Sequence, residues 1–192
     1  MSEQIVQRCM VDTCVLQYAL LSLVPHKSLP VSSKPLVEAS AELLRQLKRI
    51  KVSAISWAEI NRNLRLSDAN ALGDFHSRIT IIPVSAEAAK LSATLLTAKT
   101  GHDKTCSRCL NSLQTTPCKQ CKAKLPKSSH LADALILATA ELRRDIDVLY
   151  TADAGFGFYQ AESLIQSCTI RRPPNPHGPL FERAAAAEEA SL

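Results

Sequence analysis

The chain has 192 residues, of which 46% are hydrophobic and 21% charged, so it can form one globular domain with a full core, alone or with an appendage. Aromatic residues make up only 4%, which predicts a mostly aliphatic core. No run of 18 or more apolar residues occurs, and this argues against a membrane-spanning helix. The formal net charge of +5 suits a polyanionic partner if the surplus is gathered on one surface.

Short apolar stretches alternate with longer helical patterns along most of the chain. The predicted strands are RCMVDTCV (ending near Asp12), KVSAIS (51–56), RITIIPV (78–84), DVLYT (147–151) and SCTI (167–170). The predicted helices are TCVLQYALLSLV (stopping at Pro25), PLVEASAELLRQLKRI (35–50), a helix opened by Ser56, SAEAAKLSATLLTAK (85–99), and one from Ser128 or Ser129 to about Arg144. Such alternation predicts an α/β fold with a central parallel sheet and helices on both faces.

Two of these helices carry recognisable amino-terminal caps. Ser56 is expected to cap the third helix, with Glu59 in its first turn completing a capping box. Ser85 is expected to cap the fourth, with Glu87 in the first turn. The composition changes sharply at 171–192, where prolines and then alanines predict a linker followed by a flexible or partner-binding tail.

A cysteine-rich segment interrupts the alternation between the fourth and fifth helices. Its spacing, Cys-x2-Cys-x8-Cys-x2-Cys, is formed by Cys106, Cys109, Cys118 and Cys121. Two tight pairs fit a four-thiolate zinc site that is structural, because no position is left for water or substrate. An iron–sulfur cluster also uses four cysteines, but the tight turns favour zinc. The globular domain is thus predicted over 1–170, with a zinc-ribbon-like module inserted at 102–127.

The same segment carries most of the charge surplus. Between Lys99 and Lys127 there are seven basic residues and one acid, while the rest of the chain has 16 basic and 17 acidic residues. The residues expected to grip nucleic-acid phosphates there are Arg108, Lys119, Lys122 and Lys124. The alternative is a segment that only staples a long loop or supports a dimer contact.

Four acids fall where a parallel sheet places its functional residues. Asp12 ends the first strand, Glu59 follows the second and Asp153 follows the fourth, and the carboxyl ends of parallel strands meet at one edge. Asp133 lies on the helix before the fourth strand, among alanines and large aliphatic residues, with no Lys or Arg within one turn. A buried carboxylate costs several kcal/mol unless it is paired, so a shared divalent metal is predicted. For any single acid, a rim carboxylate or helix cap is the better interpretation.

These motifs resemble those of the PIN-domain nucleases, especially the VapC-type toxins. The matching residues are V-D-T (11–13), I-S-W-A-E (55–59), A-D-A-L-I (132–136) and V-L-Y-T-A-D-A-G-F (148–156), and the resemblance covers about residues 8 to 170 apart from the cysteine segment. It implies a three-layer α/β/α domain whose acids bind one or two Mg²⁺ or Mn²⁺ ions and cleave phosphodiester bonds, usually in RNA.

On this resemblance, Asp12, Asp133 and Asp153 are assigned as Mg²⁺ or Mn²⁺ ligands, and Glu59 as a further ligand or a base for the attacking water. Supporting hydroxyls are expected from Thr13 and Thr151, and phosphate contacts from Arg62 and Arg65, although these arginines suit a solvated face equally well. Asp147 competes with Asp153 but precedes its strand. His130 is interpreted as a residue near a helix start.

The sequence therefore predicts a cytoplasmic, metal-dependent endoribonuclease, either the toxin of a toxin–antitoxin pair or a related RNA-processing enzyme. The apolar stretch after Asp12 follows an acid and lacks a small-residue cleavage site, so it does not suit a signal peptide. Cys9, Cys14 and Cys168 are interpreted as buried small hydrophobic residues. The resemblance implies an antitoxin partner, which the tail or the Arg62–Arg65 side could meet, and a homodimer. The alternatives are a DNA-cutting or structure-selective nuclease, and a non-catalytic nucleic-acid-binding scaffold.

Overall fold

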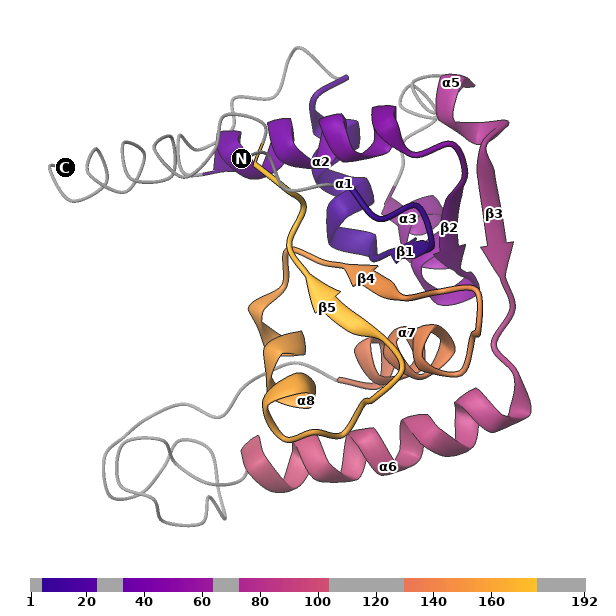
Figure 1. The fold of residues 1–192 in the computed structure, drawn as a ribbon, viewed down its shortest axis with the longest axis vertical. Helices are drawn as coiled ribbons and strands as arrows, with labels where there is room; N and C mark the ends of the chain where they lie inside the picture. Colours follow the sequence, from indigo (N-terminus) through magenta and orange to yellow (C-terminus); the bar gives the residue numbers. More distant parts are fainter. Residues whose placement is uncertain (1–4, 24–32, 64–72, 104–129, 176–192) are drawn as a thin grey trace, which may run out of the picture.

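The computed structural model describes residues 5–23, 33–63, 73–103 and 130–175 (Figure 1). The four cysteines of the predicted zinc module, Arg65, the basic residues expected to grip phosphate in the cysteine segment, and residues 176–192 of the predicted linker and tail lie outside these ranges. Within them, the strands are β1 (Cys9–Val11), β2 (Ile50–Ser53), β3 (Ile79–Ile82), β4 (Val148–Tyr150) and β5 (Thr169–Arg171). All four strand pairings are parallel and the order is β3-β2-β1-β4-β5, which confirms the predicted parallel α/β sheet.

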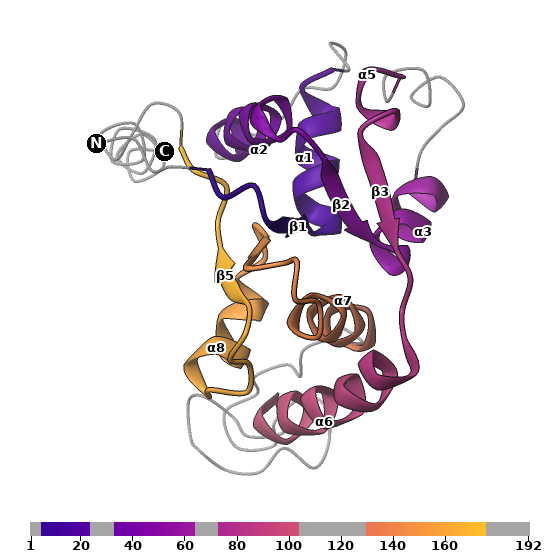
Figure 2. The same cartoon turned by 45° about the vertical axis from the view of Figure 1, so that its right-hand side comes forward.

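Helices cover both faces of this sheet, as Figure 2 shows. One side carries α1 (Thr13–Leu21), α2 (Lys34–Gln46), α3 (Ala54–Asn63) and the short α5 (Gly73–His76). The other side carries α6 (Ala86–Asp103), α7 (Leu131–Glu141) and α8 (Gly157–Ala161), the last preceded by a 3-10 turn, η3 (Ala154–Phe156). None of the helices in the described ranges is both long and apolar enough to cross a membrane.

The alternating side chains of the central strands divide the core into two clusters. Cys9 and Val11 of β1 pack with α1 and α2 on one face, whereas Met10 packs with α7 on the other. Tyr150 and Leu149 divide in the same way on β4, because successive residues of a strand point to opposite faces. Both faces are apolar, as expected for a parallel sheet buried between helices. The acids must therefore gather at the strand ends and not on the faces.

The start of α3 differs from the sequence expectation. The helix begins at Ala54, and the Ser53 hydroxyl accepts from the Ser56 backbone N–H at 2.9 Å. Ser53 therefore fills the capping role predicted for Ser56, and Glu59 lies in the second turn, so the predicted capping box is wrong. Both serines are suitable cap residues, and the sheet ends early enough for the first one to be used. The predicted cap at Ser85 is confirmed, since its hydroxyl accepts from the Ala88 N–H at 3.1 Å.

The helices around the cysteine segment also have shifted ends. α6 continues to Asp103, two residues into the range predicted for the zinc module. Lys99, predicted as part of the basic segment, is only 8% exposed and its ammonium lies 4.7 Å from the centre of the Phe158 ring. α7 has His130 at its N-cap and ends at Glu141, three residues before the predicted end. The short α5, η3 and α8 were not predicted, because three to five residues carry too little periodicity.

Candidate active site at the carboxyl ends of β1 and β4

The chain changes direction within the sheet between β1 and β4. From β1 the sheet grows through β2 and β3 on one side and through β4 and β5 on the other. In open α/β sheets, binding crevices form at the carboxyl ends of the strands beside such a switch point. Asp12 directly follows β1, and its backbone N–H donates to the carbonyl of Tyr150, the last residue of β4, at 3.0 Å. Asp12 and the residues after Tyr150 therefore share one edge.

Asp12 is a buried carboxylate held by several donors. It is 4% exposed and serves as the N-cap of α1, where Oδ1 accepts from the Thr13 N–H at 2.6 Å. Oδ2 accepts from the Thr151 hydroxyl at 2.8 Å and from the Cys14 thiol at 3.0 Å. Burial raises the pKa of Asp12 above its ordinary value, and the charge of Asp153 raises it further, whereas the three hydrogen bonds lower it.

Cys14 is a member of this site that the sequence did not reveal. Its Sγ donates to Asp12, lies 3.3 Å from the Thr151 hydroxyl and accepts from the Ala152 backbone N–H at 3.1 Å. Burial and the neighbouring Asp12 charge raise the pKa of the thiol to about 12, so it remains protonated and can donate. The interpretation of Cys14 as a buried small hydrophobic residue is incomplete, because the side chain packs against the core only half-buried and also joins the loop after β4 to the start of α1. Cys9 and Cys168 are buried as predicted.

Asp133 faces the same edge from the first turn of α7. Its side chain is 31% exposed, and His130 Nδ1 lies 3.6 Å from its Oδ2. Partial burial raises the pKa of Asp133 to about 6, with added contributions from the charges of Asp12 and Asp153, while the contact with His130 lowers it. Because the charges of Asp12 and Asp153 both raise the pKa of Asp133, the three aspartates lie near one another although they are far apart in the sequence. His130, interpreted only as a residue near a helix start, is also the local partner of Asp133.

Asp153 is an exposed carboxylate oriented by its own loop. Its Oδ1 accepts from the Gly155 N–H at 2.7 Å, and its backbone N–H donates to the Thr151 hydroxyl at 3.0 Å. A Cβ on Gly155 would lie 3.1 Å from Asp153 Oδ1, so the absence of a side chain there allows the close approach. Thr151 thus contacts Asp12 through its hydroxyl while accepting from the backbone of Asp153.

Glu59 joins the cluster through Thr13. The Thr13 hydroxyl donates to Glu59 Oε2 at 2.5 Å, which connects α3 to the start of α1. Arg62, one turn beyond Glu59, has an exposed side chain. Asp147, the competitor of Asp153, lies at the opposite edge of the sheet, where it forms an ion pair with Arg8 at 3.1 Å. The lower rank given to Asp147 therefore agrees with its position.

The three aspartates fit a hard divalent cation by their donor chemistry. None of them forms an ion pair with a Lys or Arg within the described residues, although Asp12 is nearly fully buried. As placed, no three His, Cys, Asp or Glu side chains in that part of the chain stand close enough to hold one ion. The carboxylates would have to draw together to bind an ion.

The fold belongs to the PIN-like α/β class, with a parallel sheet ordered β3-β2-β1-β4-β5. Among solved structures, the chain is similar to VapBC2 from Rickettsia felis, in a crystal structure bound to a DNA fragment from their promoter. The TM-score is 0.50 at 17% sequence identity, over 85% of this chain and 97% of that chain. No protein-family model matches the sequence, and no curated protein matches it. At this identity the similarity establishes the fold alone.

Proposed function

We propose that the chain is a metal-dependent endoribonuclease of the PIN type, which hydrolyses phosphodiester bonds in RNA. The observation that carries the proposal is the gathering of Asp12, Asp133 and Asp153 at the switch point of the sheet, where each pKa shift of Asp12 and Asp133 includes the charge of a neighbouring aspartate. Among the described residues no Lys or Arg partners these carboxylates, so a bound cation would offset their repulsion.

Each residue of the site has a definable role. Asp12, Asp133 and Asp153 would hold Mg²⁺ or Mn²⁺, which lowers the pKa of a bound water and neutralises charge on the leaving oxygen. Thr151 and Cys14 fix the orientation of the Asp12 carboxylate through their donated hydrogen bonds. Glu59, oriented by Thr13, would complete the ligand set or take the proton of the attacking water.

The proposed biological role, partners and zinc site rest on the resemblance and on the sequence. The toxin role, an antitoxin partner and a homodimer rest on the resemblance to VapC-type proteins. The four cysteines, Cys106, Cys109, Cys118 and Cys121, are proposed to bind a structural zinc ion that holds the basic residues Arg108, Lys119, Lys122 and Lys124 near the acids. Arg62 would contact phosphate from the exposed side of α3, and Arg65 is proposed for the same role.

A second candidate is a non-catalytic scaffold that binds nucleic acid with this fold. The observation favouring it is that no group of three ligating side chains in the described residues closes around an ion. The two candidates differ in their response to divalent ions. A nuclease should be stabilised by Mg²⁺ or Mn²⁺ through its aspartates, whereas a scaffold should be indifferent to them.

The test compares cleavage of single-stranded RNA and DNA of matched sequence by the full chain with Mg²⁺, Mn²⁺ or a chelator. Asp133→Asn is expected to abolish RNA cleavage, while Asp147→Asn, an exposed aspartate at the opposite edge, should retain it. Cleavage of DNA alone would support the DNA-cutting alternative. Cleavage that survives Asp133→Asn and Asp12→Asn in the purified protein would refute the proposed site.

A further inference from the structure

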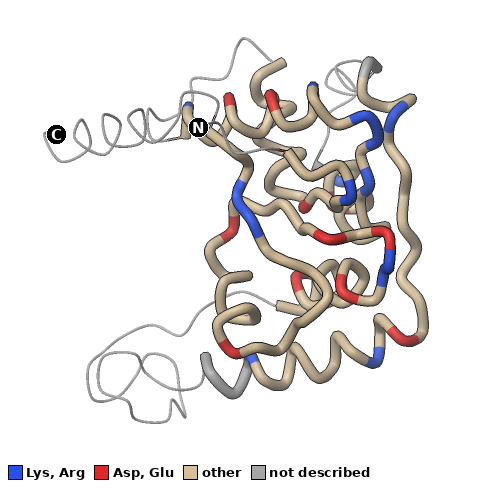
Figure 3. Tube along the Cα trace, in the orientation of Figure 1, with Lys and Arg blue, Asp and Glu red and all other residues tan. Residues whose placement is uncertain are grey.

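The edge of the sheet opposite the aspartates carries a concentration of positive charge. The residues that precede or begin β1, β2, β3 and β4 at this edge, here called the amino-edge stripe, are Arg8, Lys48, Arg49, Lys51, Arg78, Arg143 and Arg144. Two acids, Asp145 and Asp147, lie among these seven basic residues, and a third, Glu141, lies just before Arg143 with its carboxylate accepting from the backbone N–H groups of residues 166–168. Figure 3 shows Lys and Arg positions gathered on the side where the turns before β2, β3 and β4 lie.

Direct contacts show that the four turns of the stripe adjoin one another. The Ile50 N–H donates to the carbonyl of Arg78 at 2.9 Å, which places the starts of β2 and β3 together. The Asp147 N–H donates to the carbonyl of Arg8 at 2.7 Å, which does the same for β4 and β1. Lys51 reaches from β2 to the turn before β4, where its Nζ lies 2.8 Å from the Asp145 carbonyl. The stripe therefore crosses four neighbouring strands, a span of roughly 14 Å at the usual strand spacing.

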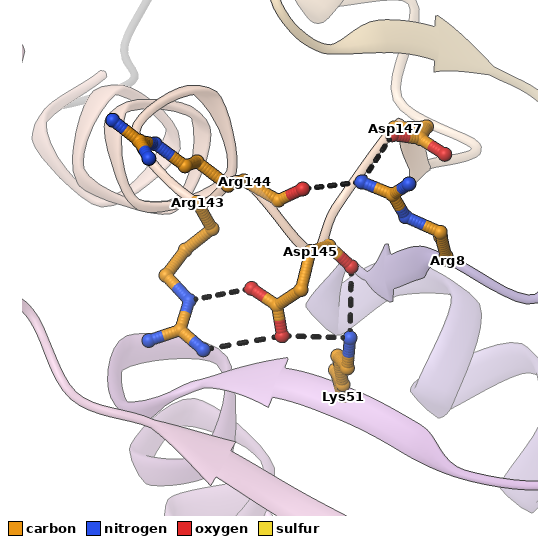
Figure 4. A network of polar contacts seen from close by, with 6 residues as sticks. All are labelled: Arg8, Lys51, Arg143, Arg144, Asp145 and Asp147. Carbon is orange, nitrogen blue, oxygen red and sulfur yellow. Dashed lines mark hydrogen bonds and ion pairs between the residues drawn. The ribbon is translucent and has the colours of Figure 1, made fainter.

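The two acids are already engaged by part of the stripe (Figure 4). Asp145 accepts from Lys51 at 2.9 Å and from Arg143 Nε and Nη2 at 2.9 and 3.1 Å. Asp147 pairs with Arg8, which also donates to the carbonyl of Arg144. These contacts fix the turn before β4 against β1 and β2. The two acids therefore pair with Arg8, Lys51 and Arg143 and form no ion pair with the other basic residues of the stripe.

Three cations of the stripe are left for a partner. Lys48, Arg49 and Arg144 are exposed, and none of their side chains forms an ion pair within the described residues. A merely solvating surface mixes basic and acidic residues evenly, whereas this surface has seven basic residues against two acids, both of which are already paired. Such a surface suits a phosphate backbone, which is read by charge and not by sequence.

We propose that the amino-edge stripe is a second RNA-binding surface, which contacts the phosphates of a substrate strand on the edge opposite the catalytic acids. The proposal rests on the proposed function for the identity of the polyanion. It means that a long RNA is held on two sides of the domain, while a short one reaches only the acids. The stripe should therefore increase the affinity for long strands and leave the cleavage of short ones unchanged.

The test measures binding of a single-stranded RNA of roughly 30 nucleotides to the full chain without added Mg²⁺ or Mn²⁺, in the Asp133→Asn background so that no cleavage occurs. Replacing Lys48, Arg49 and Arg144 together by Ala should lower the slope of log affinity against log salt by about 2, since each lost phosphate contact removes about 0.7. At 0.1 M salt this corresponds to a loss of affinity of up to about 100-fold.

The matched control keeps the charge at the same positions. The triple variant Lys48→Arg, Arg49→Lys and Arg144→Lys should retain both the affinity and the salt slope. Equal losses in both triple variants, or an alanine triple no weaker than the distant single variant Lys90→Ala, would overturn the proposal. Because binding is measured without catalysis, a chain that cleaves nothing can still confirm the stripe. Conversely, cleavage of short RNA by the alanine triple made in the wild-type background would show the active site intact even if the stripe fails.

Discussion

Replacing Asp133 by Asn measures the cost of a charged carboxylate at this partly buried position beside Asp12 and Asp153. Partial burial and the charges of Asp12 and Asp153 raise the pKa of Asp133 from 3.8 to about 6. The folded protein therefore binds this proton more tightly than the unfolded chain, so ionisation of Asp133 opposes folding. The penalty is complete above pH 6, where a difference of about 2 pKa units corresponds to about 3 kcal/mol. It declines as the pH falls from about 6 towards 3.8 and disappears below that value.

The assay is urea unfolding of the metal-free protein at two pH values. Asp133→Asn should raise the free energy of unfolding by up to about 3 kcal/mol at pH 7.5, and by about 1 kcal/mol at pH 4.5. The exposed control Asp147→Asn loses only its ion pair with Arg8 and should change the free energy by less than about 1 kcal/mol at pH 7.5. Added Mn²⁺ should stabilise the wild type and the control but not Asp133→Asn.

Two results would contradict this reasoning. If Asp133→Asn destabilised the metal-free protein at pH 7.5, the contact between Asp133 and His130, 3.6 Å apart, would outweigh the repulsion. If the gain in stability did not shrink as the pH fell, its origin would not be the charge of Asp133.

Three further predictions concern single contacts. Gly155→Ala should displace the Asp153 carboxylate, because the new Cβ would lie 3.1 Å from Oδ1, and should weaken Mn²⁺-dependent stabilisation severalfold; Gly157→Ala, with nothing within 4 Å of its Cβ, should not. Cys14→Ala should lower the free energy of unfolding by about 1–3 kcal/mol in urea, because it leaves the Ala152 N–H without its acceptor, whereas Cys14→Ser should lose less. Asp145→Asn should cost about 1 kcal/mol in the same assay by weakening the contacts of Lys51 and Arg143; an equal loss from Glu162→Gln, at an exposed acid, would assign the effect to net charge instead.

The sequence predicted the features that depend on local pattern. Alternating strands and helices indicated the parallel sheet, and acids placed directly after strands, such as Asp12, indicated the edge where they gather. Cys14 was missed because a cysteine followed by Val15 and Leu16 has the pattern of a core residue, and two of its three polar partners are 137 and 138 positions away in the chain.

The charge distribution shows the same limit on a larger scale. The basic residues of the cysteine segment are close in sequence, so their sum was easy to see. Those of the amino-edge stripe are scattered from position 8 to position 144 and become neighbours only when four parallel strands start at one edge.

The start of α3 could not be predicted for a different reason. Ser53 and Ser56 are equally suitable cap residues, and the choice between them depends on where β2 ends.

The start of α7 carries a consequence for regulation by metal supply. His130 is the N-cap residue of this helix, and its Nδ1 lies 3.6 Å from Oδ2 of Asp133 in the first turn. The chain reaches this turn directly from the segment that carries the four cysteines. If the cysteines bind zinc and the aspartates bind an oxygen-ligated ion, as proposed, a thiophilic chelator should disturb both sites, so that the supply of one metal would control the occupancy of the other.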